Sequence, residues 1–269
     1  MAVEESGSPP DTITTTGDDL FSFQDSPRRR RCTGGCDRPV SVCLCDTIPK
    51  EPILTGTQVL ILQHPHEQRH KLATVPVLVK CLRNCTILVG RRLCYGHSPL
   101  LDSLHDAAVE NPDHQFRSIY LFPGTNSSTA VEIGQFLSSP TASHISNYML
   151  IAFDGTWKHA KEMVDASLPF LSKFAVPICL DYDEKEDGGT MFDSDLILRK
   201  EPFSGCKSTL EAIARILHYL EPNGAEIEDK LVQILRVMVG FQSCNLRPTK
   251  PRPKLLRKCK REKNDVNTS

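Results

Sequence analysis

The stretch Asp154-Gly155-Thr156-Trp157 brings together a carboxylate, a glycine, a hydroxyl group and the only tryptophan of the chain. A buried strand is predicted over 147–155 ("NYMLIAFDG"), so Asp154 comes at the end of that strand. A carboxylate in this position needs a hydrogen-bonding partner or a chemical task, such as accepting a proton. Two plainer interpretations stay open: Asp154 caps the following helix, and Trp157 packs in the core.

Four cysteines close to one another could hold a metal ion. They lie within fourteen residues, at Cys32, Cys36, Cys43 and Cys45. Four thiolates in a reduced protein are a typical ligand set for tetrahedral zinc. Bound metal would fix a segment that is too short to have its own core. The spacing is not the usual pair of C-x-x-C units, so a cysteine-rich linker stays as the alternative.

The stretch "HEQRH", from His66 to His70, matches the H-E-x-x-H pattern of zinc proteases. On a helix its two histidines would share one face and bind zinc, with Glu67 as the general base. The motif follows a strand and Pro65 directly, however, and no third histidine extends the pattern. A zinc metalloprotease is therefore kept only as an alternative.

The stretch "SGCKST", from Ser204 to Thr209, resembles a phosphate-binding loop but lacks the glycine and lysine spacing of a Walker A motif. It opens the most strongly amphipathic helix predicted in the chain, over 206–221. Free backbone N–H groups at such a helix start can hold a carboxylate or a phosphate. Ordinary helix capping by Ser204, Ser208 or Thr209 explains the same residues.

Composition limits the class of protein. The chain has 269 residues, of which 39% are hydrophobic, enough for one sizeable core with a small appended module. Its net charge is −1, but basic residues gather at 28–31 and 250–263, which suggests an anionic partner such as nucleic acid or a nuclear-import signal. No apolar run reaches the length of a membrane span, and no signal peptide is evident. We therefore expect an intracellular protein with reduced thiols.

Strands and helices are predicted to alternate along the chain, which indicates a mostly parallel sheet with helices on both faces. The predicted strands cover 57–63, 85–90, 118–124, 147–155, 174–180 and 194–202, and the predicted helices 72–82, 128–137, 156–167, 206–221 and 227–244. Residues 91–115 are predicted to be loop with a weak helix. Ligands of such sheets bind beyond the carboxyl ends of the strands, where this sequence has "QHPHE", "FPG", "FDGTW" and "LRKEP".

Taken together, these motifs resemble the DTW-domain family of tRNA-uridine aminocarboxypropyltransferases. The matching stretches are "CDRPVSVCLC", "QHPHE" followed by "LATVPVL", "LFPG", "DGTW" and "LRKEP" with "CKSTLEA", in family order from Cys32 to Cys244. The Cys-Leu-Cys form and the basic tail are closer to the eukaryotic branch. One departure is "CTGGC", where the family pattern is C-x-x-C.

The resemblance implies a SPOUT-like α/β fold with a C-terminal knot that binds the cofactor. It implies that S-adenosylmethionine donates its 3-amino-3-carboxypropyl group to N3 of a uridine, in the D-loop of cytoplasmic tRNA. The products would be acp3U and methylthioadenosine. A SPOUT-type RNA methyltransferase shares this fold and cofactor and remains an alternative, as does a non-catalytic RNA-binding module with a zinc knuckle.

The resemblance also implies roles for individual residues. Asp154 would take the N3 proton or orient the uracil, and these two roles stay open. Thr156 would offer a hydrogen bond, and Trp157 a stacking surface for a base. The residues expected to line the cofactor pocket are Glu67, Pro123, Gly124, Gly155, Leu198, Arg199, Ser208 and Thr209, with Glu211 as a weaker candidate for the donor ammonium. The residues expected to contact tRNA phosphates are Arg28, Arg29, Arg30, Arg31, Lys254, Arg257, Lys258, Lys260 and Arg261.

Four parts of the chain are expected: a disordered tail over 1–31, a zinc-knuckle-like segment over 32–49, a catalytic domain over 50–246 and a basic tail over 247–269. We expect the protein in the cytoplasm, the nucleus or both, because a basic tail serves nuclear import and RNA binding equally well. The sequence does not indicate an oligomeric state.

Overall fold

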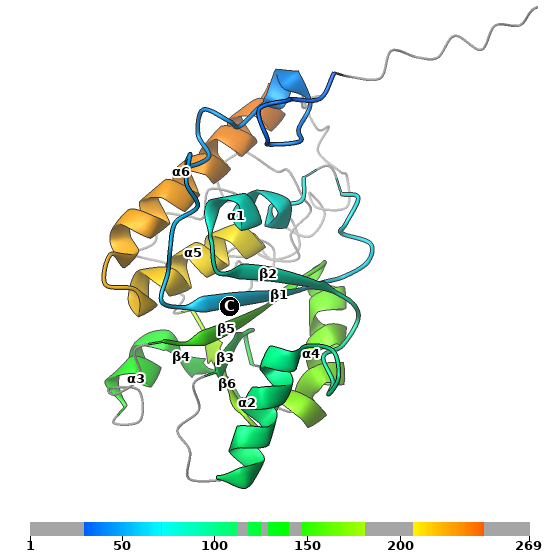
Figure 1. Cartoon of the computed structure of the whole chain (residues 1–269), viewed down its shortest axis with the longest axis vertical. Coiled ribbons are helices and arrows are strands. Elements are labelled where there is room, and N and C mark those ends of the chain that lie inside the picture. The colour runs from blue at the N-terminus through cyan, green and yellow to red at the C-terminus, as the bar shows by residue number, and fades with distance from the viewer. Residues whose placement is uncertain are drawn as a thin grey trace, which may run out of the picture.

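A computed structural model describes residues 30–70, 72–111, 118–124, 129–139, 147–180 and 207–244 of the chain. Its centre is a six-stranded sheet in the order β2-β1-β5-β3-β6-β4, and every neighbouring pair of strands is parallel (Figure 1). The strands are β1 (Gln58–Gln63), β2 (Cys85–Val89), β3 (Ser118–Leu121), β4 (Val131–Glu132), β5 (Met149–Asp154) and β6 (Ala175–Cys179). The helices are the 3-10 turn η1 (Val40–Val42), α1 (Val75–Cys81), α2 (Pro99–Glu110), α3 (Ile133–Ser138), α4 (Trp157–Leu171), α5 (Thr209–Leu220) and α6 (Gly224–Ser243). Among these helices, none combines the length and apolar character needed to cross a membrane.

The predicted alternation of strands and helices is confirmed, with differences in detail. The region predicted as one helix over 128–137 begins with the short edge strand β4, because Val131 pairs with Ile178 of β6 before α3 starts. The weak helix expected within 91–115 is the regular twelve-residue α2, which has Pro99 at its first position, where its missing N–H costs nothing. The strand predicted over 194–202 falls outside the described residues.

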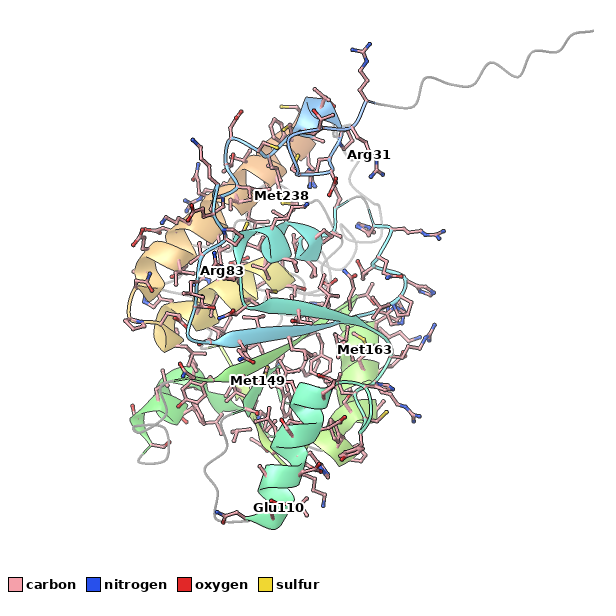
Figure 2. All side chains as sticks on the ribbon, viewed as in Figure 1. Arg31, Arg83, Glu110, Met149, Met163 and Met238 are labelled. Atoms are coloured by element: carbon pink, nitrogen blue, oxygen red, sulfur yellow. The ribbon has the colours of Figure 1, made fainter. Side chains whose placement is uncertain are left out.

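Helices cover both faces of the sheet, and each face has its own apolar core. Side chains of α1, α3, α5 and α6 pack on one face, and those of α2 and α4 on the other. Figure 1 shows α1, α5 and α6 above the strands and α2 and α4 below them. Met238 of α6 and Met163 of α4, both labelled in Figure 2, belong to these two separate cores.

The strands obey the two-residue period of β-structure, and this decides which way the site residues point. In β5, Leu150 and Ala152 face the α5–α6 side, and Ile151 and Phe153 face the α4 side. Asp154 continues the row of Leu150 and Ala152, so its side chain is directed toward α5. The same alternation applies to β1, so consecutive residues at its end point to opposite faces of the sheet.

Glu221, just after α5, ties the helical layer to the start of β1. Its two carboxylate oxygens accept hydrogen bonds from the backbone N–H groups of Gly56, at 2.9 Å, and Thr57, at 2.7 Å. Glu221 and Thr57 are both buried. Gly56 is exposed, so without the carboxylate only the Thr57 N–H would lie in the interior with no acceptor.

We therefore expect Glu221→Ala to lower the free energy of unfolding by about 1–3 kcal/mol, roughly the cost of one unsatisfied buried donor. Urea denaturation followed by circular dichroism measures this change. Glu226→Ala is the matched control, because Glu226 is exposed and its ion pair with Lys230 should contribute little to stability. Equal effects of the two substitutions would contradict the assignment.

Candidate active site at the carboxyl edge of the sheet

Asp154 is the best-anchored polar side chain at the carboxyl edge of the sheet. It is only 5% exposed. Gln63 Nε2 donates to its Oδ2 at 3.0 Å, and Thr209 Oγ1 lies 2.7 Å from its Oδ1, where the hydroxyl donates to the carboxylate. The carboxylate thus joins the end of β5, the end of β1 and the first residue of α5.

The chain topology explains why these three groups meet. Gln63 is the residue paired with Asp154 in the register of β1 and β5, and it lies on the same face. The chain runs from β1 outward to β2 and then crosses to β3, on the far side of β5. The boundary between β1 and β5 is therefore the topological switch point, where parallel α/β sheets bind their ligands.

Helix capping does not explain Asp154. The N-cap of α4 is Thr156, whose Oγ1 accepts from the backbone N–H of His159 at 3.3 Å. Similarly, the N-cap of α5 is Ser208, which accepts from the N–H of Glu211 at 3.2 Å. The sequence left Ser204, Ser208 and Thr209 open as caps, and the structure selects Ser208. Both helices start beside Asp154, and their positive ends stabilise a negative charge there.

Trp157 lies partly buried at the first position of α4 and packs against the core on the α4 side. Its ring centroid is 5.9 Å from that of Phe122, with the planes tilted by 48°. The core-packing interpretation therefore holds for part of the ring. Gly155 is placed tightly, because a Cβ there would lie 3.1 Å from the Cβ of His159. This close contact accounts for a glycine in the turn.

The other predicted cofactor residues are spread around the same edge. Pro123 and Gly124 are exposed and follow β3 closely. Leu121 of β3 pairs with Ala152 of β5, so two residues further along both strands Pro123 comes opposite Asp154. Glu67 is buried in the turn after β1. Glu211 is buried in α5 and pairs with Arg215 at 3.5 Å. Leu198 and Arg199 lie outside the described residues.

The "HEQRH" motif does not form the helical zinc site that its pattern suggested. Residues 65–69 are turns, and His70 Nδ1 accepts from the backbone N–H of Leu72. Instead His66 lies beside His64 and His159, with one ring nitrogen of each within 4.8 Å of the others. The rings of His64 and His159 are stacked at 3.9 Å with an interplanar angle of 9°. Since the lone pairs lie in the ring planes, the two stacked rings do not converge on one ion in this arrangement.

The imidazole of His64 is buried, and its position is well defined. Burial, and secondly the neighbouring His159, lowers the pKa of His64, so its ring is neutral at neutral pH. Its Nδ1 accepts from the backbone N–H of His66 at 3.3 Å. Gln63, His64 and His159 are site residues to which the sequence assigned no role. The available signal was a polar residue, Gln63, continuing the apolar row of Val59 and Ile61 in a buried strand.

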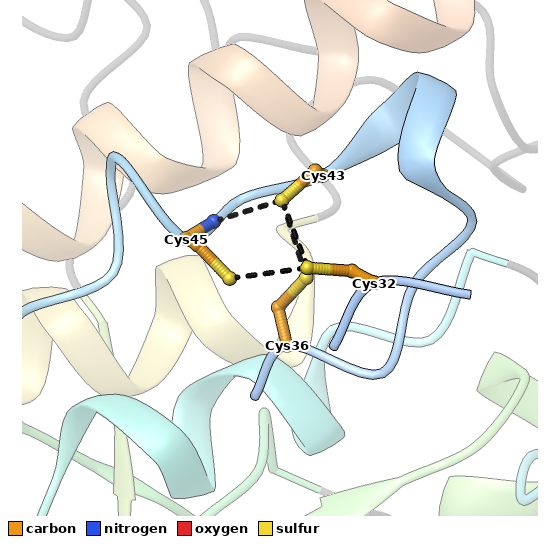
Figure 3. Close-up of side chains that lie close together, drawn as sticks. All are labelled: Cys32, Cys36, Cys43 and Cys45. Carbon is orange, nitrogen blue, oxygen red and sulfur yellow. Dashed lines mark hydrogen bonds between the residues drawn. The ribbon is translucent and has the colours of Figure 1, made fainter. Parts of the chain in front are cut away.

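The four predicted metal ligands converge, although they do not have the usual spacing (Figure 3). Cys32 Sγ lies 3.3 Å from Cys43 Sγ and 3.4 Å from Cys45 Sγ. Cys36 Sγ lies 3.7 Å from Cys43 Sγ. A tetrahedral site with metal–sulfur bonds of about 2.3 Å has sulfur–sulfur edges of about 3.8 Å, so the sulfurs fit a zinc ion with little rearrangement.

The two glycines of "CTGGC" accommodate the extra residue. Gly35 has a φ of +102°, which L-residues rarely adopt, and it turns the chain between Cys32 and Cys36. A Cβ on Gly34 would lie 3.0 Å from Cys45 Sγ and 3.4 Å from Cys32 Sγ. The longer spacing is therefore compatible with a four-sulfur site, as long as both positions are glycine.

The thiols of Cys36 and Cys45 differ in how readily they ionise. Burial opposes ionisation of Cys36, but backbone N–H groups of Leu44 and Arg38 hydrogen-bond its sulfur and lower its pKa to about 6. A hydrogen bond with Cys32 raises the pKa of Cys45 to about 12. The Cys36 thiolate thus forms readily, whereas the raised pKa values of Cys43 and Cys45 oppose loss of their protons until a cation binds.

The cysteine segment is part of the main core and does not form a separate body. Leu44 is fully buried, and Cys36 is buried in the core on the α5–α6 side. Lys80, in the last turn of α1, forms an ion pair with Asp37 at 3.0 Å. Arg30 and Arg31 lie exposed beside this segment, and Arg31 is labelled in Figure 2. The remaining predicted RNA contacts, at 28–29 and 254–261, fall outside the described residues.

Fold and geometry together define an α/β protein with a candidate ligand site at the carboxyl edge of its sheet and an attached four-cysteine segment. The chain belongs to the DTW-domain family, whose model, described as DTW domain, matches residues 29–243. Its resemblance to the eukaryotic members is confirmed by the relatives described next.

Three curated relatives are named for the same activity. The chain is 49% identical over 243 residues to "tRNA-uridine aminocarboxypropyltransferase A" of Arabidopsis thaliana, covering 87% of this chain and 89% of that protein. It is 30% identical to "tRNA-uridine aminocarboxypropyltransferase 2" of Mus musculus, covering 88% and 75% of the two chains. The protein of that name from Drosophila melanogaster is also 30% identical, with 82% and 78% covered. No solved structure matches the chain.

Proposed function

We propose that this protein is a tRNA-uridine aminocarboxypropyltransferase. Its membership of the DTW-domain family and its 49% identity to the plant enzyme support this function. The observation that carries the mechanism is the buried Asp154, held at the sheet's switch point by Gln63 and Thr209. In this proposal S-adenosylmethionine is the donor, and N3 of a tRNA uridine, in the D-loop, is the acceptor.

The reaction joins N3 of the uracil to the γ-carbon of the donor side chain. The carbon–sulfur bond to that carbon breaks, and its electron pair stays on sulfur, which leaves as the neutral thioether methylthioadenosine. The N3 proton must go to a base. The sulfonium is already a good leaving group, so the protein chiefly has to align the two reactants.

Asp154 is the proposed acceptor of that proton. Gln63 and Thr209 each donate to one oxygen of the carboxylate, whose two oxygens offer about four acceptor sites, so the group is suited to accept from a uracil N3–H. Two donors and two helix starts favour the ionised form of a carboxylate at this position. Its fixed orientation would also align the uracil plane, which combines the two roles that the sequence left open.

The rest of the pocket follows from positions around Asp154. Thr156 caps α4 with its hydroxyl, so we assign it to holding the turn rather than to the uracil. The exposed part of Trp157 is the proposed stacking surface for a base. Glu67, Pro123, Gly124, Gly155, Leu198, Arg199 and Ser208 stay proposed cofactor contacts, within a SPOUT-like knotted arrangement that the family resemblance implies. A place in the cytoplasm, the nucleus or both stays part of this proposal.

The reaction is tested by incubating purified protein with S-adenosylmethionine and unmodified tRNA, followed by mass spectrometry of the nucleosides. We expect acp3U and methylthioadenosine with the wild type. Asp154→Asn, which keeps the shape but removes the base, should lower the rate by about 10²–10⁴-fold. Methylated nucleosides and S-adenosylhomocysteine would identify a methyltransferase instead. Binding of tRNA without any new nucleoside would indicate a non-catalytic RNA-binding module.

Substitution of Thr209 tests which of two roles this residue at the start of α5 has. The sequence suggested that it holds the donor carboxylate, whereas its hydroxyl donates to Asp154 in the structure. We expect Thr209→Val to lower kcat by about 10- to 100-fold, the effect of one hydrogen bond to a charged group, with the affinity for S-adenosylmethionine unchanged. Thr209→Ser should restore most of kcat. A weaker affinity for the donor with kcat unchanged would favour the first interpretation.

We further propose that Cys32, Cys36, Cys43 and Cys45 hold a structural zinc ion. The sulfur–sulfur distances support it. Gly34→Ala should weaken metal binding by about 10- to 100-fold, because the added Cβ pushes against Cys45 Sγ. Zinc per chain, measured by atomic emission after dialysis against a chelator, reports this loss. Gly134→Ala is the matched control, since a Cβ there meets nothing within 4 Å. Wild-type protein that takes up no zinc, even when zinc is supplied in excess, would contradict the proposal.

A further inference from the structure

We propose that three loops at the carboxyl edge, on the α4 side, bind the phosphate backbone of the tRNA next to the target uridine. This inference rests on the proposed function and adds a binding site on the folded domain, separate from the two terminal basic stretches. The site consists of six side chains, called here the basic rim: His66 and Arg69 after β1, Arg91 and Arg92 after β2, and, where the loop after β5 enters the first turn of α4, Lys158 and His159.

The sheet brings the three loops together. β2, β1 and β5 are neighbours, and their last residues, Val89, Gln63 and Asp154, form one row across the sheet. The Gly90 N–H donates to the Gln63 carbonyl at 3.0 Å, and the His64 N–H donates to the Asp154 carbonyl at 2.8 Å. All three loops therefore leave the sheet at the same level.

The histidines form the centre of the rim. His66 is exposed and lies edge-on to the stacked pair of His64 and His159. Nδ1 of His159 is buried and has no hydrogen-bond partner within the described residues. A small rotation of that ring toward a bound phosphate would give the nitrogen an oxygen to bond, which would remove the cost of leaving it unpaired.

The charges of the rim fit an extended anion. Arg69, Arg91 and Arg92 are exposed, and an arginine fork matches the oxygens of a phosphate group. Arg91 is close enough to His64 to help lower its pKa. Two carboxylates are nearby: Glu67, buried in the first loop, and Glu162, which pairs with Lys158 at 3.9 Å. The basic side chains project from an open surface, which suits a polymer backbone better than an enclosed small anion.

The rim also lies at the right place for the proposed chemistry. Gln63 and His64 are consecutive, and they point to opposite faces of the sheet. Gln63 holds Asp154 on the α5 side, and His64 stacks on His159 on the α4 side. A nucleotide whose uracil reaches Asp154 can therefore place its own phosphate or a neighbouring one at the rim, across the end of a single strand.

The test measures tRNA binding by the full-length protein over a range of salt concentrations. Arg91→Gln combined with Arg92→Gln should weaken binding by about tenfold and reduce the slope of log K against log salt by about two, one for each lost phosphate contact. The affinity for S-adenosylmethionine, measured in parallel, should not change, which shows that the fold is intact. Replacing both arginines by lysine should keep most of the slope.

Arg83→Gln is the matched control. Arg83 is exposed and precedes β2, so it lies at the opposite edge of the sheet, and it is labelled in Figure 2. An unchanged slope in the double variant, or an equal loss with Arg83→Gln, would overturn the proposal. If the wild type binds tRNA but forms no acp3U, the proposed function fails. The change in salt slope of the double variant still shows whether the basic rim binds tRNA. If the wild type neither binds nor modifies tRNA, both proposals fail.

Discussion

The rest of the site depends on one buried carboxylate, Asp154, and the two hydrogen bonds that it accepts. Burying a charged group is costly unless hydrogen bonds compensate, and here the donors come from the ends of a strand and of a helix far apart in the chain. Gln63, Asp154 and Thr209 therefore fix the relative positions of β1, β5 and α5. The same bonds orient the carboxylate, so one interaction serves both the fold and the proposed chemistry.

The period of two along the strands divides the carboxyl edge into two functional sides. On the α5 side, the Asp154 carboxylate is surrounded by donors and helix starts. On the α4 side, the His66 imidazole and the arginines of the basic rim face the solvent. The separation is a consequence of sheet geometry, because neighbouring residues of one strand cannot point to the same face. The Asp154 carboxylate and the arginines of the basic rim thus lie at the same edge of the sheet but on opposite faces.

The cysteine segment depends both on packing against the domain and on the arrangement of its four sulfurs. It has no core of its own, yet Leu44 and Cys36 are buried in the core of the domain, and Lys80 holds its loop through Asp37. Apolar packing positions the segment, while the four sulfurs define its internal geometry. A metal ion would therefore complete a segment that is already docked on the domain.

The sequence by itself determined the alternating α/β class, most strand and helix positions and the cysteine cluster, and it made Asp154 a candidate site residue. These follow from local patterns: apolar runs, periodicity and residue types at strand ends. The family could be identified because several such motifs occur in one order. The edge strand β4 was missed, because a two-residue strand exists only through its pairing with β6.

Only the tertiary structure decided which residues meet. Nothing local indicates that Gln63 pairs with Asp154, that Thr209 bonds the same carboxylate, or that His66 joins His64 and His159 rather than His70. Strand register and helix docking join residues separated by 91 and 55 positions in the chain. Such contacts are set by the packing of the whole sheet, whereas the motifs are set by the neighbouring residues of the chain.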